Sequence, residues 1–195
     1  EDSVALTEAK RRFDETDPDD LPAEIRPLII NANVRQFETP EMIDKLFTIY
    51  QNTPSADLQV DIALSLTSTK NPATTEQILT AIKDTTIIRP QDASRWFIYL
   101  IRTRENRQIA WNWLKENWSW VKDTFGGDKS YDTFIRYAAS ALLTRDELND
   151  FTEFTTPLRA EPALTRTIDL GIREIAGRVA LIERDQAAVI DALDR

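Results

Sequence analysis

Hydrophobic residues recur along most of the chain at steps of three and four positions, the spacing that places them on one face of a helix. The first stripe contains Val4, Leu6, Ala9 and Phe13 and predicts a helix that ends near Glu15. Similar stripes, separated by short joints, predict helices over residues 22–36, 39–53, 55–67, 72–83, 90–103, 105–122, 130–142, 144–157 and 161–193.

The residues at the joints support this division. Thr39 precedes Pro40 and is a plausible N-cap for a helix whose buried stripe contains Ile43, Leu46, Phe47 and Tyr50. In the helix before it, Pro22 suits the first turn, and the predicted buried face contains Ile25, Leu28, Ile29, Ala32 and Val34.

Three segments depart from the pattern. Residues 14–20 combine turn-forming residues with five acidic side chains and predict an exposed connection. Residues 85–88 are β-like but short and close to Pro90, so they are interpreted as an extended loop packed between helices. Gly171 and Gly177 interrupt the last stripe, where they would weaken or bend the helix.

These patterns predict an all-α fold. Only 4 glycines occur in 195 residues, too few for the tight turns of a β protein. Consecutive helices joined by very short turns must lie antiparallel to their neighbours. We therefore expect a HEAT-like α-solenoid of antiparallel helix pairs, formed by residues 1–195 as a single domain, with a compact bundle as the alternative.

Composition restricts the chemistry. The chain has no cysteine and no histidine, which excludes thiolate sites, thiol nucleophiles and every serine–histidine arrangement within it. A net charge of -9 disfavours nucleic acid and anionic lipid as partners, and no apolar run is long enough to span a bilayer. The chain starts without methionine, which suggests a fragment of a longer protein. We expect a cytoplasmic location.

The densest feature is residues 110–120, which contain four of the five tryptophans. On one helix, Trp111 and Trp118 fall on one side, while Trp113 and Trp120 fall on another. Such a helix is most simply wedged between neighbours, with its indole N–H groups bonded to polar partners. A stacking platform for a peptide or sugar, with one tryptophan exposed, is the functional alternative.

No catalytic constellation is evident among the carboxylates. Asp57 and Asp61 lie one turn apart, as do Glu147 or Asp146 and Asp150, but such spacings arise freely in acidic helices and indicate solvated faces. The segment 125–130 contains Gly, Lys and Ser without the spacing of a phosphate-binding loop, and a joint with glycine at positive φ explains it better.

Two arginines form the main candidate site. Arg89 and Arg95 flank Asp92 at the start of a predicted helix, where Asp92 can cap the helix or pair with Arg95. Their expected role is structural. At a joint between solenoid helices, however, the same arginines could bind a carboxylate through paired hydrogen bonds.

Several of these motifs together resemble a known family. The chain contains, in this order, Gln91-Asp92, Ala110-Trp111-x-Trp-Leu-x-x-Asn117-Trp118 and Phe125-Gly126-Gly127-Asp128. In these motifs it resembles the C-terminal domain of the aminopeptidase N family. The segments 118–128, 144–148 and 178–182 look most like the lysyl aminopeptidases of lactic-acid bacteria. The likeness runs from about Ala5 to the end and is strongest after Gln91.

The resemblance implies a fold and a role. In that family a zinc enzyme removes N-terminal residues from peptides with a His-Glu-x-x-His helix in a separate catalytic domain, and no such helix occurs here. The last domain is a helical, HEAT-like bowl that closes the peptide chamber. The resemblance thus implies a non-catalytic domain without its own cofactor, with zinc in the parent and with the parent's catalytic domain and a peptide substrate as partners.

The resemblance also has departures. The family's domain is longer, which would leave an apolar edge exposed at Val4, Leu6 and Phe13. Animal relatives that bind a peptide C-terminus place an arginine before a Thr-Lys-Asn triplet, where this chain has Ser68; Lys70 is the candidate substitute. Lys70, Arg89 and Arg95 are therefore the candidate substrate-binding residues. The alternative function is a freestanding HEAT-like adaptor that binds a protein or peptide.

Overall fold

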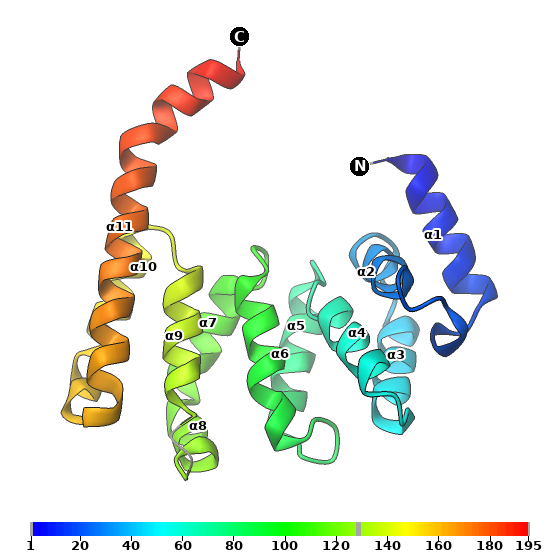
Figure 1. Cartoon of the computed structure of the whole chain (residues 1–195), viewed down its shortest axis with the longest axis horizontal. Coiled ribbons are helices and arrows are strands. Elements are labelled where there is room, and N and C mark those ends of the chain that lie inside the picture. Colours follow the sequence, from blue (N-terminus) through cyan, green and yellow to red (C-terminus); the bar gives the residue numbers. More distant parts are fainter. Residues whose placement is uncertain (1, 128–129, 195) are drawn as a thin grey trace. The chain divides into compact units, whose positions relative to one another are not determined.

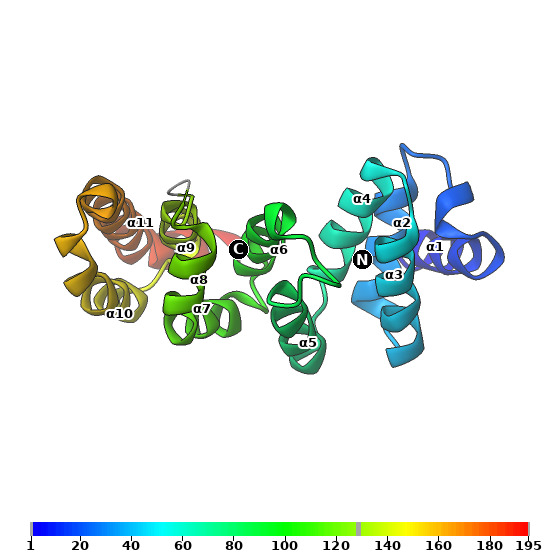
Figure 2. The same ribbon diagram turned by 90° about the horizontal axis from the view of Figure 1, so that it is seen from below.

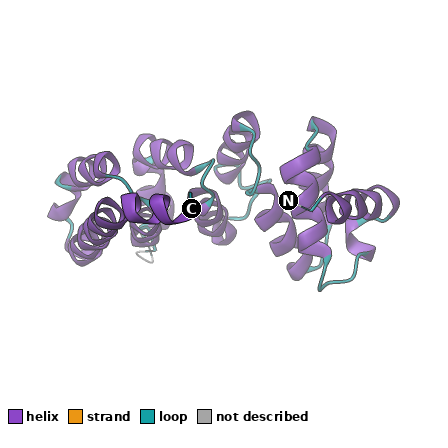
Figure 3. Cartoon of the chain, turned by 90° about the horizontal axis from the view of Figure 1, so that it is seen from above, coloured by secondary structure: helices purple, strands orange, loops and turns teal. Residues whose placement is uncertain are grey.

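The computed structural model describes residues 2–127 and 130–194. Within those ranges the chain forms helices and no strand (Figures 1 and 3). They are α1 (Ser3–Glu15), η1 (Pro18–Asp20), α2 (Arg26–Phe37), α3 (Pro40–Asn52), α4 (Ala56–Leu66), α5 (Pro72–Ile82), α6 (Pro90–Arg102), α7 (Arg107–Glu116), α8 (Trp118–Phe125), α9 (Asp132–Ala141), α10 (Arg145–Thr155), η2 (Pro157–Ala160) and α11 (Pro162–Leu193), the two η segments being 3-10 helices. The all-α, solenoid-like class is confirmed.

The chain divides into two compact units, Glu1–Ala110 and Trp111–Arg195, with the boundary inside α7. The prediction that residues 1–195 form a single domain stays a prediction. In the first unit α3 and α5 lie in one layer and α4 and α6 in the other (Figure 2). Consecutive helices, α3 with α4 and α5 with α6, pack against each other across the two layers.

Half of the ten predicted helix starts carry a side-chain cap in the structure. Thr39 accepts a hydrogen bond from the Met42 N–H, as predicted, and the stripe Ile43, Leu46, Phe47 and Tyr50 is buried. Comparable side-chain caps begin α1, α4, α5 and α10, at Asp2, Ser55, Asn71 and Thr144. The sequence thus predicts the first residue of these helices to within one or two positions, because the cap bond joins residues that are close in sequence.

The second predicted helix begins later than expected. Residues 22–25 form a turn, and α2 starts at Arg26 with Pro27 in its first turn. The buried face differs as well: Leu28 is 67% exposed, while Ile30 and Asn33 are fully buried. Including Leu28 in the core was therefore wrong.

The predicted helix over 105–122 is two helices. α7 ends at Glu116 and α8 begins at Trp118, with the N-cap Asn117 at φ -108° and ψ 18° between them. The hydrophobic stripe is nearly continuous across this residue, so periodicity alone could not reveal the break.

Two joints also differ from expectation. Residues 85–88 form no strand, as predicted, but they are a turn rather than an extended loop, because the Ile87 and Ile88 N–H groups both bond to the Asp84 carbonyl. The fully buried Ile88 anchors this turn in the core. Gly126 has φ -70°, and Gly127 does not reach positive φ, so the predicted left-handed joint is wrong at both residues. Asp128 and Lys129 lie outside the described residues.

An ion pair links α2 to α4 in the first unit. The Arg26 Nε donates to Asp61 Oδ2 at 2.7 Å, and both side chains are largely buried. Asp61 was expected on a solvated face, and that expectation was wrong. Its distant partner could not be read from helical spacing, because the two residues lie 35 positions apart.

The second unit has an aromatic core. Trp111 is fully buried between Phe151, at a ring distance of 5.7 Å, and Phe154, at 5.4 Å. Its indole N–H donates to Asp150 at 2.6 Å, as does the Lys115 ammonium at 2.6 Å. Although burial raises the pKa of Asp150, these two bonds lower it below the usual value overall. Asp150 is therefore a partner of the core and not a solvated carboxylate.

The core interpretation of the tryptophans is thus confirmed for Trp111 and Trp118, which are buried. Trp113 and Trp120 are half-buried and pack edge to face against each other at 5.8 Å. The buried Trp118 indole N–H has no hydrogen-bond partner among the described residues, contrary to the expectation that every indole N–H would find one.

The last helix is continuous through both glycines. Its first half buries Leu164, Ile168, Gly171, Ile175 and Val179. α9 and α10 pack along this half, and the last turns of α11 extend beyond them (Figure 1). Along those turns the apolar residues are exposed, among them Ile182, Val189 and Leu193.

The apolar edge expected near the start of the chain is only partly present. Val4 is 77% exposed and Leu6 half-exposed, but Phe13 is buried. None of the helices in the described part of the chain is long and apolar enough to cross a membrane.

Gly171 provides a test of this packing. A Cβ at this position would lie 2.8 Å from the Ala139 Cβ and 3.1 Å from the Phe151 ring. Because neither neighbour can move away easily, Gly171→Ala should lower the free energy of unfolding by about 1–2 kcal/mol, despite the better helix propensity of alanine. Urea unfolding followed by circular dichroism measures the change.

Gly177→Ala is the matched control, because nothing lies within 4 Å of a Cβ there. It should raise the free energy of unfolding by up to about 1 kcal/mol. Equal effects of the two substitutions would contradict the close packing of Gly171.

Candidate functional site

Arg89 and Arg95 do come together, on either side of Asp92. The Arg89 Nε donates to Asp92 Oδ2 at 3.0 Å, and an Arg95 Nη1 lies 3.8 Å from Asp92 Oδ1. Asp92 is buried, whereas about half of each arginine side chain is exposed. Asp92 therefore pairs with both arginines, as predicted for Arg95, and it makes no capping bond to the α6 backbone.

The three residues line a cavity of about 230 Å³ between α4 and α6. Gln59 fixes the other side of Arg89, accepting a 2.9 Å hydrogen bond from its Nη2. Tyr50 and Trp96 form the aromatic wall, where the Trp96 indole N–H donates to the Tyr50 oxygen at 3.3 Å and burial raises the pKa of Tyr50. With Asp57 also in the lining, two arginines face two carboxylates, which leaves the cavity without formal net charge.

Lys70 lies elsewhere. It is exposed in the joint between α4 and α5, at the end of the first unit opposite the joint that precedes α6 (Figure 1). The pKa of Glu105 is lowered, mainly by a backbone hydrogen bond and further by the hydrogen bond and charge of Arg35 and by the charge of Lys70. The three predicted residues thus form two separate sites.

The joint that carries Lys70 is bonded from both sides. The Glu38 carboxylate accepts hydrogen bonds from the hydroxyls of Thr69 and Thr74 and, at 3.1 Å, from the Asn71 amide. The Thr74 bond measures 2.5 Å. Asn71 also caps α5 through its own side chain. This side of the joint is therefore tied to the end of α2.

Asn106 ties the other side of the same joint. It is fully buried between α6 and α7, and its Nδ2 donates to the carbonyls of Thr67 and Thr69, each at 3.0 Å. Its Oδ1 accepts a 2.8 Å hydrogen bond from the Thr75 hydroxyl. Both N–H groups of the amide and one of the two lone pairs of Oδ1 thus have partners, and Lys70 projects from a fixed turn.

Arg35 is a residue that sequence reasoning missed. Its Nη1 donates to the Ser68 carbonyl at 2.9 Å and its Nη2 to Glu105 at 3.0 Å. A guanidinium therefore lies beside Ser68, the position where the resemblance implies an arginine in animal relatives. No sequence signal connects two residues 33 positions apart, so only the fold brings Arg35 to Lys70's joint.

No three His, Cys, Asp or Glu side chains gather as a metal site would require anywhere in residues 2–127 and 130–194. The side chains at the two sites offer hydrogen bonds and charge.

Comparisons with known proteins agree with this picture. Residues 1–177 match the family model of the ERAP1-like C-terminal domain. The chain is 35% identical to aminopeptidase N of Lactobacillus helveticus and 31% identical to aminopeptidase N of Lactococcus lactis subsp. lactis, in both cases over 89% of this chain. It is 26% identical to aminopeptidase M1 of Arabidopsis thaliana over 87% of this chain. In each case it spans about 20% of the relative's length.

Asn106 should be essential to the joint that carries Lys70. Asn106→Leu keeps a similar volume but removes three buried hydrogen bonds. The Thr67 carbonyl and the Thr75 hydroxyl keep other partners, Thr103 and Asn71, but the Thr69 carbonyl loses its bond, so the free energy of unfolding should fall by about 2–3 kcal/mol. Asn52→Ala is the control, since Asn52 is exposed and bonds only within its own helix, to the Thr48 carbonyl. Urea unfolding measures both, and a loss below about 1 kcal/mol for Asn106→Leu would contradict this role.

Proposed function

Because the chain belongs to the ERAP1-like C-terminal domain family, we propose that it is the non-catalytic C-terminal domain of a zinc-dependent aminopeptidase. In this proposal it packs on the catalytic domain of the same protein and closes the peptide-binding chamber. The observation that carries the proposal is the correspondence of most of the chain with the C-terminal part of aminopeptidase N in two lactic-acid bacteria.

The catalytic zinc belongs to another part of the parent protein in this proposal. Histidine is the usual zinc ligand of such enzymes, and the chain contains none. The cytoplasmic location remains a prediction, which fractionation of cells that produce the parent would test.

Peptide binding is proposed for the two sites with arginine or lysine. Arg89 and Arg95 each expose part of a guanidinium at one cavity, and Lys70 lies near Arg35 at the other end of the first unit. A guanidinium can bind a peptide carboxylate with two parallel hydrogen bonds, whereas an ammonium acts as a point charge. Arg89 and Arg95 are therefore the stronger candidates for a carboxylate, and Lys70 the weaker.

The role of the whole chain is tested by removing it from the parent. The isolated chain, with added zinc, should not release p-nitroaniline from lysine p-nitroanilide. The parent without this chain should bind the same amount of zinc but show a kcat/KM for a hexapeptide that is at least about 10-fold lower, because the chamber wall is missing.

Adding the isolated chain back should restore part of that loss. Unchanged hexapeptide kinetics after truncation would contradict the chamber role. A gene that encodes only these residues would instead favour the freestanding adaptor.

The arginine site is tested with paired substrates. In the parent, Arg89→Gln with Arg95→Gln should raise KM about 5-fold or more for a peptide with a free C-terminal carboxylate, and leave KM unchanged for its C-terminal amide. Arg166→Gln in α11, an exposed residue, is the control. Equal changes for the two substrates would show that the arginines do not bind the carboxylate. Lys70→Gln tests the second site in the same way.

A further inference from the structure

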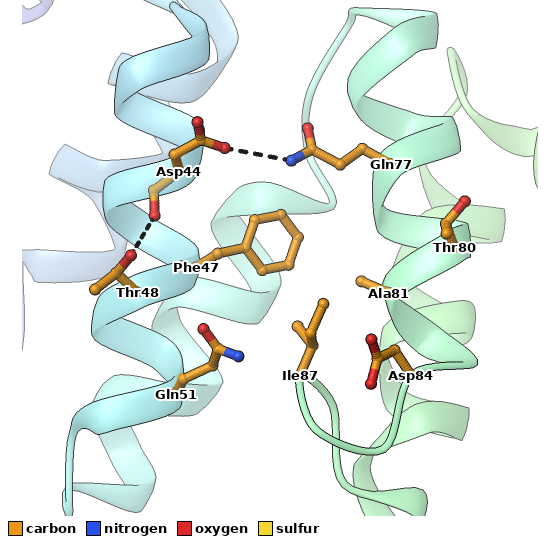
Figure 4. Close-up of a pocket in the computed structure, with 9 residues that line it drawn as sticks. All are labelled: Asp44, Phe47, Thr48, Gln51, Gln77, Thr80, Ala81, Asp84 and Ile87. Atoms are coloured by element: carbon orange, nitrogen blue, oxygen red, sulfur yellow. Dashed lines mark hydrogen bonds between the residues drawn. The ribbon is translucent and has the colours of Figure 1, made fainter.

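A second cavity of the first unit lies apart from both candidate sites. It is a groove of about 490 Å³ between α3 and α5, closed on one side by the turn that follows α5 (Figure 4). Its volume is in the range of small-molecule and side-chain binding pockets. Neither the Arg89 cavity nor the joint at Lys70 shares a residue with it.

The floor of the groove is apolar and rigid. Phe47 points into the space between the helices, opposite Ala81 and Ile87 (Figure 4). The Phe47 ring is only 8% exposed and stacks on the buried Trp96 ring, at 5.8 Å between centroids and an angle of 4° between planes. The ring is thus held in a fixed position at the floor of the groove.

Two carboxylates from opposite sides of the groove face this floor. Asp44 comes from α3 and accepts only a long 3.4 Å hydrogen bond from Gln77. Asp84 lies in the turn that follows α5 and accepts bonds from the Thr86 hydroxyl at 2.6 Å and the Thr86 N–H at 2.9 Å, which lower its pKa. Both bonds to Asp84 reach one oxygen, Oδ1.

Neither lysine nor arginine lines the groove. The nearby Lys45 of α3 pairs instead with Asp17 at 3.0 Å. The lining therefore carries two negative charges above an apolar floor, together with the amides of Gln51 and Gln77. The charge that complements it is positive.

We propose that this groove binds an arginine side chain of a separate peptide. A guanidinium can donate two parallel hydrogen bonds to the Asp44 carboxylate, while Asp84, further along the groove, adds negative potential. The three methylene groups of the side chain would cover Ala81 and Ile87. An ammonium group cannot form the paired hydrogen bonds and is more strongly hydrated, so lysine should bind less well.

The test uses a matched pair of probes on the 195-residue chain. Acetyl-Leu-Arg-Leu-amide and its citrulline analogue have nearly the same shape, but only the first carries a charge. In nitrogen–proton correlation spectra, the arginine peptide should shift the resonances of groove residues in a saturable way. The citrulline peptide should bind at least about 10-fold more weakly.

Variants locate the binding. Asp44→Asn with Asp84→Asn should reduce affinity for the arginine peptide at least about 10-fold. Glu153→Gln with Glu174→Gln removes the same two charges from exposed positions of the second unit and should have no effect. If the aspartate variant unfolds, Thr80→Arg serves instead, because an arginine on α5 at the groove should occupy it and block the peptide.

The proposal is overturned if the two peptides bind equally, which would indicate an apolar groove without charge recognition. It is also overturned if neither peptide shifts the groove resonances, or if the shifts map to the second unit. Because the readout is binding to this chain alone, the result is independent of whether the parent is an aminopeptidase.

Discussion

The structure depends on how the ends of its many short helices are bonded. Each helix leaves up to four N–H groups at its start and four carbonyls at its end without partners inside the helix. α2 to α10 have only 8 to 13 residues each, so these end groups are a large fraction of their backbone. An arrangement that buries the ends is stable only if side chains supply the missing bonds.

The two kinds of end are satisfied in different ways. At the starts of α1, α3, α4, α5 and α10, a side chain close in sequence accepts from the backbone, and Thr144 with Glu147 does so as a full capping box. At the ends of α4 and α9, a donor also comes from a neighbouring element. Asn106 donates to the joint after α4, and Arg178 of α11 donates to the Ala139 and Leu142 carbonyls at the end of α9. These long-range bonds fix which helix packs beside which.

This difference explains how much could be predicted from the sequence. The helices and most of their starts followed from stripes and caps, because both are local. Asp61 and Asp150 were misassigned to solvent because their partners, Arg26 and Trp111, lie 35 and 39 positions away. The break at Asn117 was missed because it leaves the hydrophobic stripe nearly intact.

The candidate site was predictable to a similar extent. Arg89 and Arg95 each lie three positions from Asp92, so their pairing with it follows from spacing. The separation of Lys70 from them, and the approach of Arg35 to Ser68, follow only from the stacking of helices. Both depend on residues far apart in sequence.

The same constraint limits where this chain can bind anything. Polar side chains at the joints are largely engaged with backbone carbonyls: Asn106 donates to two of them, and Arg35 divides its donors between Ser68 and Glu105. A ligand at such a joint would have to compete with bonds that stabilise the fold. Side chains on the flanks of the helices do not have to bond to these backbone carbonyls. The groove between α3 and α5 retains Asp44, which no joint requires, and Asp84, whose bonds to its own turn reach only one of its two oxygens. The freest binding chemistry of the first unit therefore lies between α3 and α5.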